Sequence, residues 1–131
     1  MSINNYCVSI EKYAERYFIK NFAKKYGQAW DITVEALKRE LQSFEVLLLK
    51  TIAEIIVEKE GVKISKVEFK VAGTNESRHG SGNRCIVAIN DQDKSIKILL
   101  LYHKNHLGKG NETAKWKQII KENYLEYKNL L

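Results

Sequence analysis

The apolar residues in the first fifty positions recur at helical spacing. Ala14, Phe18 and Phe22 follow one another every four residues, and Gly27 stands where such a helix would end. A second helix is predicted to begin at Asp31, a favourable N-cap. Its apolar stripe steps by three and four residues and consists of Val34, Leu37, Leu41, Phe44 and Leu48. Two neighbouring helices with one apolar face each predict a helical hairpin packed against a flat partner.

Segments of strand character precede and follow these helices. They are rich in β-branched residues and are bounded by turn residues such as Glu60-Gly61 and the run 90–93. The predicted strands are Asn5–Ile10, Ala53–Glu58, Val62–Val71, Arg84–Ile89 and Ile96–Tyr102. The last two are apolar almost throughout, which predicts central strands that are covered on much of both faces.

The third of these strands has two different faces. Its apolar face consists of Val67, Phe69 and Val71, and its charged face of Lys66, Glu68 and Lys70. Because side chains alternate along a strand, we expect the apolar face to pack on the helices and the charged face to reach the surface.

The last part of the chain returns to helical spacing. Asn111 is a candidate N-cap, Glu112 follows it in the first turn, and the apolar stripe beyond consists of Trp116, Ile119, Ile120 and Tyr124. The pattern as a whole predicts an α+β fold: a small antiparallel or mixed sheet, packed by an N-terminal helical hairpin, with a C-terminal helix. At 131 residues, we expect one domain spanning 1–131.

Composition narrows the class of protein. With 44% hydrophobic and 29% charged residues, the chain is expected to be globular. It has no apolar run near the roughly 18 residues that would span a bilayer, and its N-terminus does not resemble a secretory signal. Cys7 and Cys85 are too few for a disulfide framework and are read as reduced core residues. The sequence therefore predicts a cytoplasmic protein without membrane association.

Positive charge is concentrated in the second half of the chain. Residues 1–60 contain nine Lys or Arg and nine Asp or Glu, whereas residues 61–131 contain thirteen and seven, which accounts for the whole net charge of +6. Clustered positive charge favours a polyanionic partner, because binding it releases counterions from a phosphate backbone. The alternative is that this charge only keeps a small protein in solution.

The residues that could take part in catalysis lie at the ends of the apolar strands. Arg84 opens one strand, and the segment Tyr102–Lys104 closes the next. Antiparallel neighbours place the start of one strand opposite the end of the other, so we expect these residues to meet. The Gly-rich run 73–83 carries Arg78 and His79 and is either a phosphate-approaching loop or a plain hairpin connection.

Other constellations in the sequence are weaker. His103 and His106 have no definite metal-ligand geometry, and no metal site or cofactor is predicted. Cys85 lies within an apolar strand, where a thiol is typically inert. Trp30 is expected to anchor the core between the two helices, with stacking on a base as the alternative.

The order of elements and the strand-end residues resemble the RelE/ParE toxin superfamily. An Arg that opens an apolar strand (NRCIVAI), followed by a strand that ends in Tyr-x-Lys (ILLLYHKN), is similar to the signature in the C-terminal half of such toxins. The likeness extends over about residues 62–124. It implies a RelE-like, microbial ribonuclease-like fold over 1–131.

The resemblance also implies an activity, namely the toxin of a type II toxin–antitoxin system that cleaves mRNA at the ribosome without metal. In this reaction the RNA 2′-OH attacks the adjacent phosphate, assisted by a base, an acid and cations. The implied catalytic residues are Arg84, Lys70, Tyr102, His103 and Lys104, and the implied RNA-binding residues are Lys66, Arg78, His79 and Lys97. The implied partners are mRNA or the ribosome and a cognate antitoxin protein.

A non-catalytic protein with the same fold is the alternative. ParE-type members share the fold but inhibit gyrase, so the chain is also consistent with a protein-binding module or an RNA-binding module. Convergence of Lys70, Arg84 and His103 or Lys104 on one face would favour the nuclease, whereas their dispersal would favour the binding module.

Overall fold

The structure is a computed structural model that describes residues 5–131. Within them, five strands form one sheet in the order β1-β5-β4-β3-β2. The strands are β1 (Cys7–Ile10), β2 (Ala53–Lys59), β3 (Val62–Phe69), β4 (Asn83–Asn90) and β5 (Ser95–His103). β1 runs parallel to β5, and the other neighbours are antiparallel. The predicted α+β fold with a mixed sheet is confirmed, and the two apolar strands are interior as expected.

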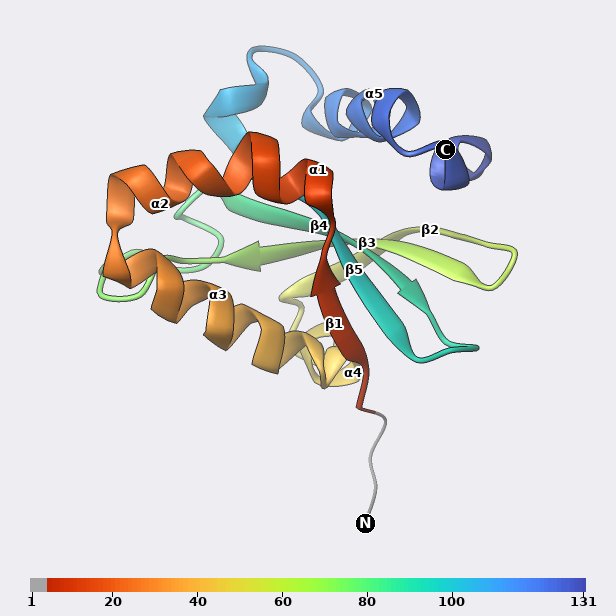
Figure 1. Cartoon of the computed structure of the whole chain (residues 1–131), viewed down its shortest axis with the longest axis horizontal. Helices are drawn as coiled ribbons and strands as arrows, with labels where there is room; N and C mark the ends of the chain where they lie inside the picture. Colours follow the sequence, from red (N-terminus) through yellow and green to blue (C-terminus); the bar gives the residue numbers. More distant parts are fainter. Residues whose placement is uncertain (1–4) are drawn as a thin grey trace.

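Helices cover both faces of this sheet (Figure 1). They are α1 (Lys12–Ala14), a π-helical turn η1 (Glu15–Ile19), α2 (Lys20–Tyr26), α3 (Gln28–Leu41), α4 (Phe44–Leu49), a 3₁₀ turn η2 (Lys104–Leu107), α5 (Glu112–Asn123) and a 3₁₀ segment η3 (Leu125–Leu130). We call the side packed by α2, α3 and α4 the α3 face, and the side packed by α5 and η3 the α5 face. Asn111 caps α5 as predicted, because its side chain accepts a hydrogen bond from Ala114 N.

The two faces carry separate apolar clusters. On the α3 face, Trp30 and Phe22 stack with ring centroids 4.5 Å apart, and both contact Phe69 of β3. On the α5 face, Trp116 and Ile120 pack on the middle strands. Trp30 is only 1% exposed, so the expectation of a core anchor is confirmed.

The N-terminal helices differ in detail from the prediction. The first helix is interrupted by η1, whose wider turn shifts the phase of the side chains beyond it. α3 begins at Gln28 instead of being capped by Asp31, because Gly27 reverses the chain with φ of 58° and starts the new helix at once. The predicted stripe is split at Gln42, where the chain turns and the Gln42 carbonyl accepts a hydrogen bond from Tyr6 N.

A β-bulge in β5 decides which side chains share a face. Ile86 of β4 pairs with Leu100 and Val87 pairs with Ile98, so Leu99 is an extra residue in β5. Because side chains alternate with a period of two, one extra residue exchanges the two faces for everything beyond it. Tyr102 therefore lies beside Arg84 on the α5 face, and His103 lies beside Asn83 on the α3 face.

None of the helices within the described residues has both the length and the apolar character needed to cross a bilayer. The expected lack of a secretory signal involves residues 1–4, which lie outside the described residues. The expectation of one domain over 1–131 stays a prediction.

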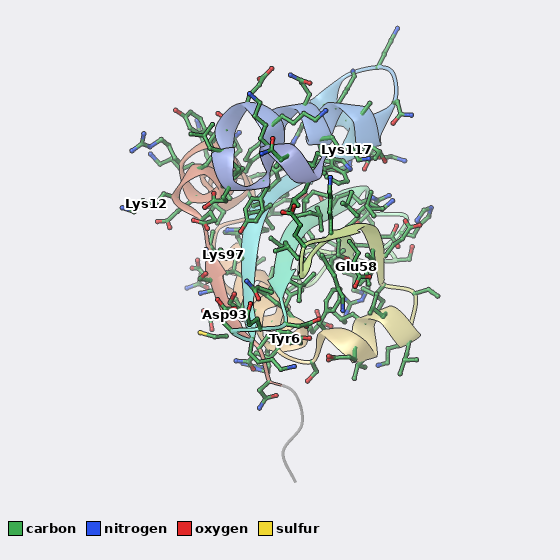
Figure 2. All side chains as sticks on the ribbon, turned by 90° about the vertical axis from the view of Figure 1, so that its right-hand side faces the viewer. Tyr6, Lys12, Glu58, Asp93, Lys97 and Lys117 are labelled. Atoms are coloured by element: carbon green, nitrogen blue, oxygen red, sulfur yellow. The ribbon has the colours of Figure 1, made fainter. Side chains whose placement is uncertain are left out.

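The turn between β4 and β5 is tied to two other elements through Asp91. The Asp91 carboxylate accepts a hydrogen bond of 2.7 Å from the Tyr6 hydroxyl and pairs with Lys63 Nζ at 2.9 Å. Figure 2 shows Tyr6 at this end of the sheet, close to the turn that carries Asp93. The hydrogen bond from Tyr6, followed by that from Lys63, lowers the pKa of Asp91 below its usual range.

Asp91→Asn is expected to lower the free energy of unfolding by about 1 kcal/mol at neutral pH, because the carboxylate is nearly half exposed. The pKa of Asp91 is lower in the folded protein than its unfolded value of about 3.9. The carboxylate therefore stabilises the fold above this pH, and the contribution is lost as the pH falls through the folded pKa. Urea unfolding of both proteins should show a difference that shrinks between about pH 5 and about pH 2. An undiminished difference at the lower pH would contradict this assignment.

Candidate functional site

Arg84 and Tyr102 form a cross-strand pair on the α5 face. The register places them directly opposite one another at the end of β4 and β5 that adjoins the 73–83 loop. Both are buried, Arg84 at 4% exposure and Tyr102 at 0%. The hairpin inference from the sequence is therefore correct for these two residues, and it places a buried cation next to a buried phenol.

Two carboxylates hold the Arg84 guanidinium. Glu68 of β3 is opposite Arg84 in the register, with Nη2 3.6 Å from Glu68 Oε2, and Glu112 of α5 lies 3.8 Å from Nε. Nη1 also donates a hydrogen bond to the Asn83 carbonyl at 3.1 Å. A buried charge is tolerated only when it is paired in this way. Arg84 therefore organises the surrounding carboxylates from below the surface.

Glu112 connects this pair to α5. The Tyr102 hydroxyl donates a hydrogen bond of 2.7 Å to Glu112 Oε2, the same oxygen that faces Arg84. Burial, followed by this hydrogen bond, raises the pKa of the Tyr102 hydroxyl well above its usual range. The phenol thus stays protonated and is a donor, not a base, in this arrangement.

Glu68 and His79 are in direct contact beside Arg84. His79 Nδ1 lies 2.6 Å from Glu68 Oε2, the oxygen that also faces Arg84. The His79 side chain is 83% exposed, whereas the Glu68 side chain is only 16% exposed. Glu68 is therefore fixed between a buried cation and an imidazole that reaches solvent.

These two residues line a cavity of about 340 Å³ on the α5 face, which we call the Glu68 cavity. Its lining residues are Thr51, Ile52, Ala53, Glu54, Lys66, Glu68 and His79. Lys66 lies two residues before Glu68 on β3, so both side chains are on the same face of the sheet. The Lys66 ammonium is 3.9 Å from Glu54 at the rim of the cavity. The cavity thus presents a carboxylate, an imidazole and an ammonium close together, with the Arg84 guanidinium behind them. Such a set can accept one proton, donate another and stabilise negative charge.

The other residues predicted from the sequence do not join this group. Lys70 and Arg78 line a different cavity of about 470 Å³, between α3, α4 and the end of β3. Arg78 is held there by an ion pair with Glu40 of α3. His103 faces the α3 face, and Lys104 begins η2 with its backbone N donating to the Gly82 carbonyl.

Lys97 is also remote from the Glu68 cavity. It is opposite Ala88, four residues along β4 from Arg84, and its ammonium pairs with Glu11 at 3.8 Å. Figure 2 shows Lys97 on the same side of the picture as Asp93, which lies in the turn before β5, and Glu58 across the sheet. The five residues proposed as catalytic therefore do not converge on one face of the sheet.

Two carboxylates of this site were not among the residues selected from the sequence. The sequence pattern places Glu68 only on the charged face of its strand, and Glu112 only in the first turn of a helix. The alternation of charge along β3 was the available signal for Glu68. Nothing local indicates which arginine a strand glutamate will face, because that depends on the register between β3 and β4.

Comparisons with known proteins support the fold. No family model matches the sequence, and no curated protein matches it. Among solved structures, the chain is similar to a chain in the crystal structure of the archaeal RelE-RelB complex from Pyrococcus horikoshii OT3, with a TM-score of 0.52 and 18% identity. The match covers 77% of this chain and 97% of that chain. The fold is RelE-like, and the prediction from the sequence is confirmed in this respect.

Proposed function

We propose that the chain is an endoribonuclease of RelE type and the toxin of a toxin–antitoxin pair. The single observation that supports this best is the contact of Glu68 with both His79 and Arg84, in a cavity that Lys66 also lines. The RelE-like fold is a second support. The substrate in this proposal is single-stranded RNA, in particular mRNA engaged by the ribosome in the cytoplasm.

The reaction we infer is attack of a ribose 2′-OH on the adjacent phosphate. Glu68 takes the proton of the 2′-OH, and the new P–O bond closes a 2′,3′-cyclic phosphate. His79, protonated on both ring nitrogens, uses Nδ1 to contact Glu68 and gives its other proton to the departing 5′-oxygen. Lys66 contacts a non-bridging oxygen of the phosphate and stabilises the charge of the pentacoordinate state.

Arg84 has a positioning role in this scheme. Its guanidinium is too deeply buried to meet solvent directly, but it fixes the Glu68 carboxylate and adds positive potential below the phosphate. Tyr102 has an indirect positioning role, because its hydroxyl donates a hydrogen bond to Glu112, which in turn pairs with Arg84. The roles of Lys70, His103 and Lys104 in catalysis stay predictions, and the positions of these residues give them no contact with Glu68.

A protein partner is part of the proposal. The similar solved chain comes from a structure described as a RelE-RelB complex. For this chain we infer a cognate antitoxin that binds residues of the basic second half of the chain, 61–131. Coexpression with the product of an adjacent reading frame, followed by size-exclusion chromatography, tests whether a stable complex forms.

The experiment that tests the nuclease is incubation of the purified chain with RNA, with and without translating ribosomes, followed by mapping of the new ends. We expect 5′-hydroxyl and 2′,3′-cyclic phosphate ends. Lys66→Gln should reduce the rate by about 10- to 100-fold, since a hydrogen bond to a charged group contributes about 1.5–3 kcal/mol. Lys97→Gln is a matched control, because Lys97 forms a similar ion pair far from the cavity.

No cleavage under either condition would overturn the nuclease proposal, as would equal losses in the two lysine variants. Products with 3′-hydroxyl ends would overturn the inferred chemistry, because attack by the 2′-OH cannot produce them.

Binding without cleavage is the second candidate function. It is favoured by the burial of Arg84 and Tyr102 and by the dispersal of Lys70 and His103 to other parts of the surface. A chain that shifts RNA or a protein target in a binding assay, yet leaves RNA ends unchanged, would support this function.

A further inference from the structure

The α3 face carries a second cavity, on the opposite side of the sheet from Glu68. It has a volume of about 570 Å³ and lies between the η1–α2 segment and the end of β5 with η2. We call it the His103 cavity. Its lining residues are Tyr17, Phe18, Asn21, Phe22, Lys25, Tyr26, Asn83, His103, Asn105 and His106. Among these described residues there is no Asp or Glu, so the cavity combines aromatic, amide and imidazole groups with one ammonium.

Asn83 is the unusual group in this cavity. It is 4% exposed, and its side-chain Oδ1 has no hydrogen-bond partner within residues 5–131. In the sheet it lies between Phe69 of β3 and His103 of β5, on the side that lines the cavity. A buried acceptor without a partner costs about 1–3 kcal/mol, and a ligand in this cavity that donates a hydrogen bond to Asn83 would remove this cost.

Hydrogen bonds with the backbone fix the orientation of the two imidazoles. His103 Nδ1 accepts a hydrogen bond from Asn105 N at 3.1 Å, and His106 Nδ1 faces His103 N at 3.4 Å. Burial, followed by the nearby His106, lowers the pKa of His103, so its ring is neutral at physiological pH. Gly82 makes room for this ring, because a Cβ there would stand 2.6 Å from His103 Nε2.

Aromatic side chains and one lysine also line the His103 cavity. Phe22 and Tyr26 of α2 are stacked with centroids 6.3 Å apart, and Phe22 also meets His106 edge-on. The Lys25 ammonium lies 5.2 Å from the centre of the Tyr26 ring. The π-helical turn contributes Tyr17 and Phe18, and such turns often occur at functional sites.

We propose that the His103 cavity binds an adenine nucleotide, either free or as part of a single-stranded RNA. An asparagine amide matches the adenine edge, because its oxygen accepts from N6 and its nitrogen donates to N7. Aromatic and imidazole rings stack on bases, and the cavity is of the size typical for a small ligand. Lys25 contacts the phosphate. This site is separate from the Glu68 cavity and does not depend on the proposed cleavage.

The test is a titration of the ¹⁵N-labelled chain with AMP, IMP and adenosine, followed by NMR. We expect AMP to shift the Asn83 side-chain amide and the resonances of His103 and His106. IMP has an oxygen in place of the N6 amine and should bind about tenfold more weakly, in line with the 1–3 kcal/mol typical of an amide–adenine pair. Short oligoadenylate is titrated in parallel. Tighter binding of the oligomer identifies RNA as the source, and equal binding identifies the free nucleotide.

Two variants separate the contributions of the base and the phosphate. Asn83→Leu should bind AMP and IMP equally, because the group that distinguishes them is gone. Lys25→Ala should weaken AMP but leave adenosine unchanged, whereas Lys24→Ala on the same helix, outside the cavity lining, should change neither. Because Lys25 and Lys24 are exposed, these two variants remain informative if Asn83→Leu does not fold.

Three results would overturn the proposal. They are no shifts with AMP up to about 1 mM, shifts confined to residues outside the cavity, and equal affinities of the wild-type chain for AMP and IMP. The titration measures binding alone, so failure of this proposal is distinguishable from failure of the nuclease proposal.

Discussion

Glu68→Gln is expected to lower the rate of RNA cleavage by about 10²–10⁴-fold, the contribution typical of a positioned general base. Glutamine has the same shape and keeps an oxygen facing Arg84, which lies 3.6 Å from the Glu68 carboxylate, but it takes up no proton at neutral pH. The variant therefore removes the proposed chemistry while it keeps most of the packing around the buried guanidinium. The measurement is the single-turnover rate on an end-labelled RNA, with thermal unfolding of both proteins as a check on the fold.

Glu54→Gln is the matched control for this substitution. Glu54 lines the same cavity but lies at its rim, with a 68% exposed side chain that pairs with Lys66 instead of with Arg84 and His79. We expect its cleavage rate to change less than about threefold, because an exposed ion pair contributes little. A Glu68→Gln protein that is folded and cleaves RNA at the wild-type rate would remove Glu68 from the mechanism.

Trp30→Ala is expected to lower the free energy of unfolding by about 3–5 kcal/mol, the range for loss of a large buried aromatic side chain. Trp30 is 1% exposed and stacks on Phe22 of α2, and its ring centroid is 6.0 Å from that of Phe69 in the sheet. Its removal leaves a cavity where α2, α3 and the sheet meet. Urea unfolding at neutral pH measures the effect.

Leu49→Ala provides the comparison, because the Leu49 side chain is 85% exposed at the end of α4. Its expected change is within about 0.5 kcal/mol. A loss below about 1 kcal/mol in Trp30→Ala would mean that the helices are not held to the sheet at this point. Because Phe22 also lines the His103 cavity, we further expect Trp30→Ala to weaken AMP binding if the protein remains folded.

Much of the fold could be predicted because its signals are local. The turn at Glu60-Gly61, the stop at Gly27 and the cap at Asn111 depend on the conformational preferences of residues next to each other. The start of α3 and its end at Leu41 were harder to predict from the sequence. The first depends on how tightly Gly27 reverses the chain, and at the second the Gln42 carbonyl accepts a hydrogen bond from Tyr6 N, far away in sequence.

The candidate site was predictable only in part. The pairing of Arg84 with Tyr102 followed from the hairpin, and His79 was selected from its loop. Glu68 was missed because a glutamate on the charged side of a strand is typically just solvent-exposed. Its importance comes from the two partners that meet at one of its oxygens.

The sequence by itself determined the kinds of element, their order and the places where the chain turns. Alternation and helical periodicity are properties of neighbouring residues, and no distant contact is needed to produce them. The RelE-like fold follows largely from that order. The accumulation of positive charge after residue 60 is likewise a property of the sequence alone.

Only the tertiary structure decided which strand-end residues work together. The segment Ile96–Leu101 is apolar apart from Lys97, and its last four residues are all Ile or Leu, so nothing in its pattern marks Leu99 as an extra residue. The bulge arises from pairing between β4 and β5, and it exchanges the faces of all later side chains. Tyr102 consequently joins Arg84 under α5, and His103 joins Asn83 at the other cavity. Two adjacent residues that look like one site in the sequence are thereby placed on opposite faces of the sheet, and Lys104 follows them in η2.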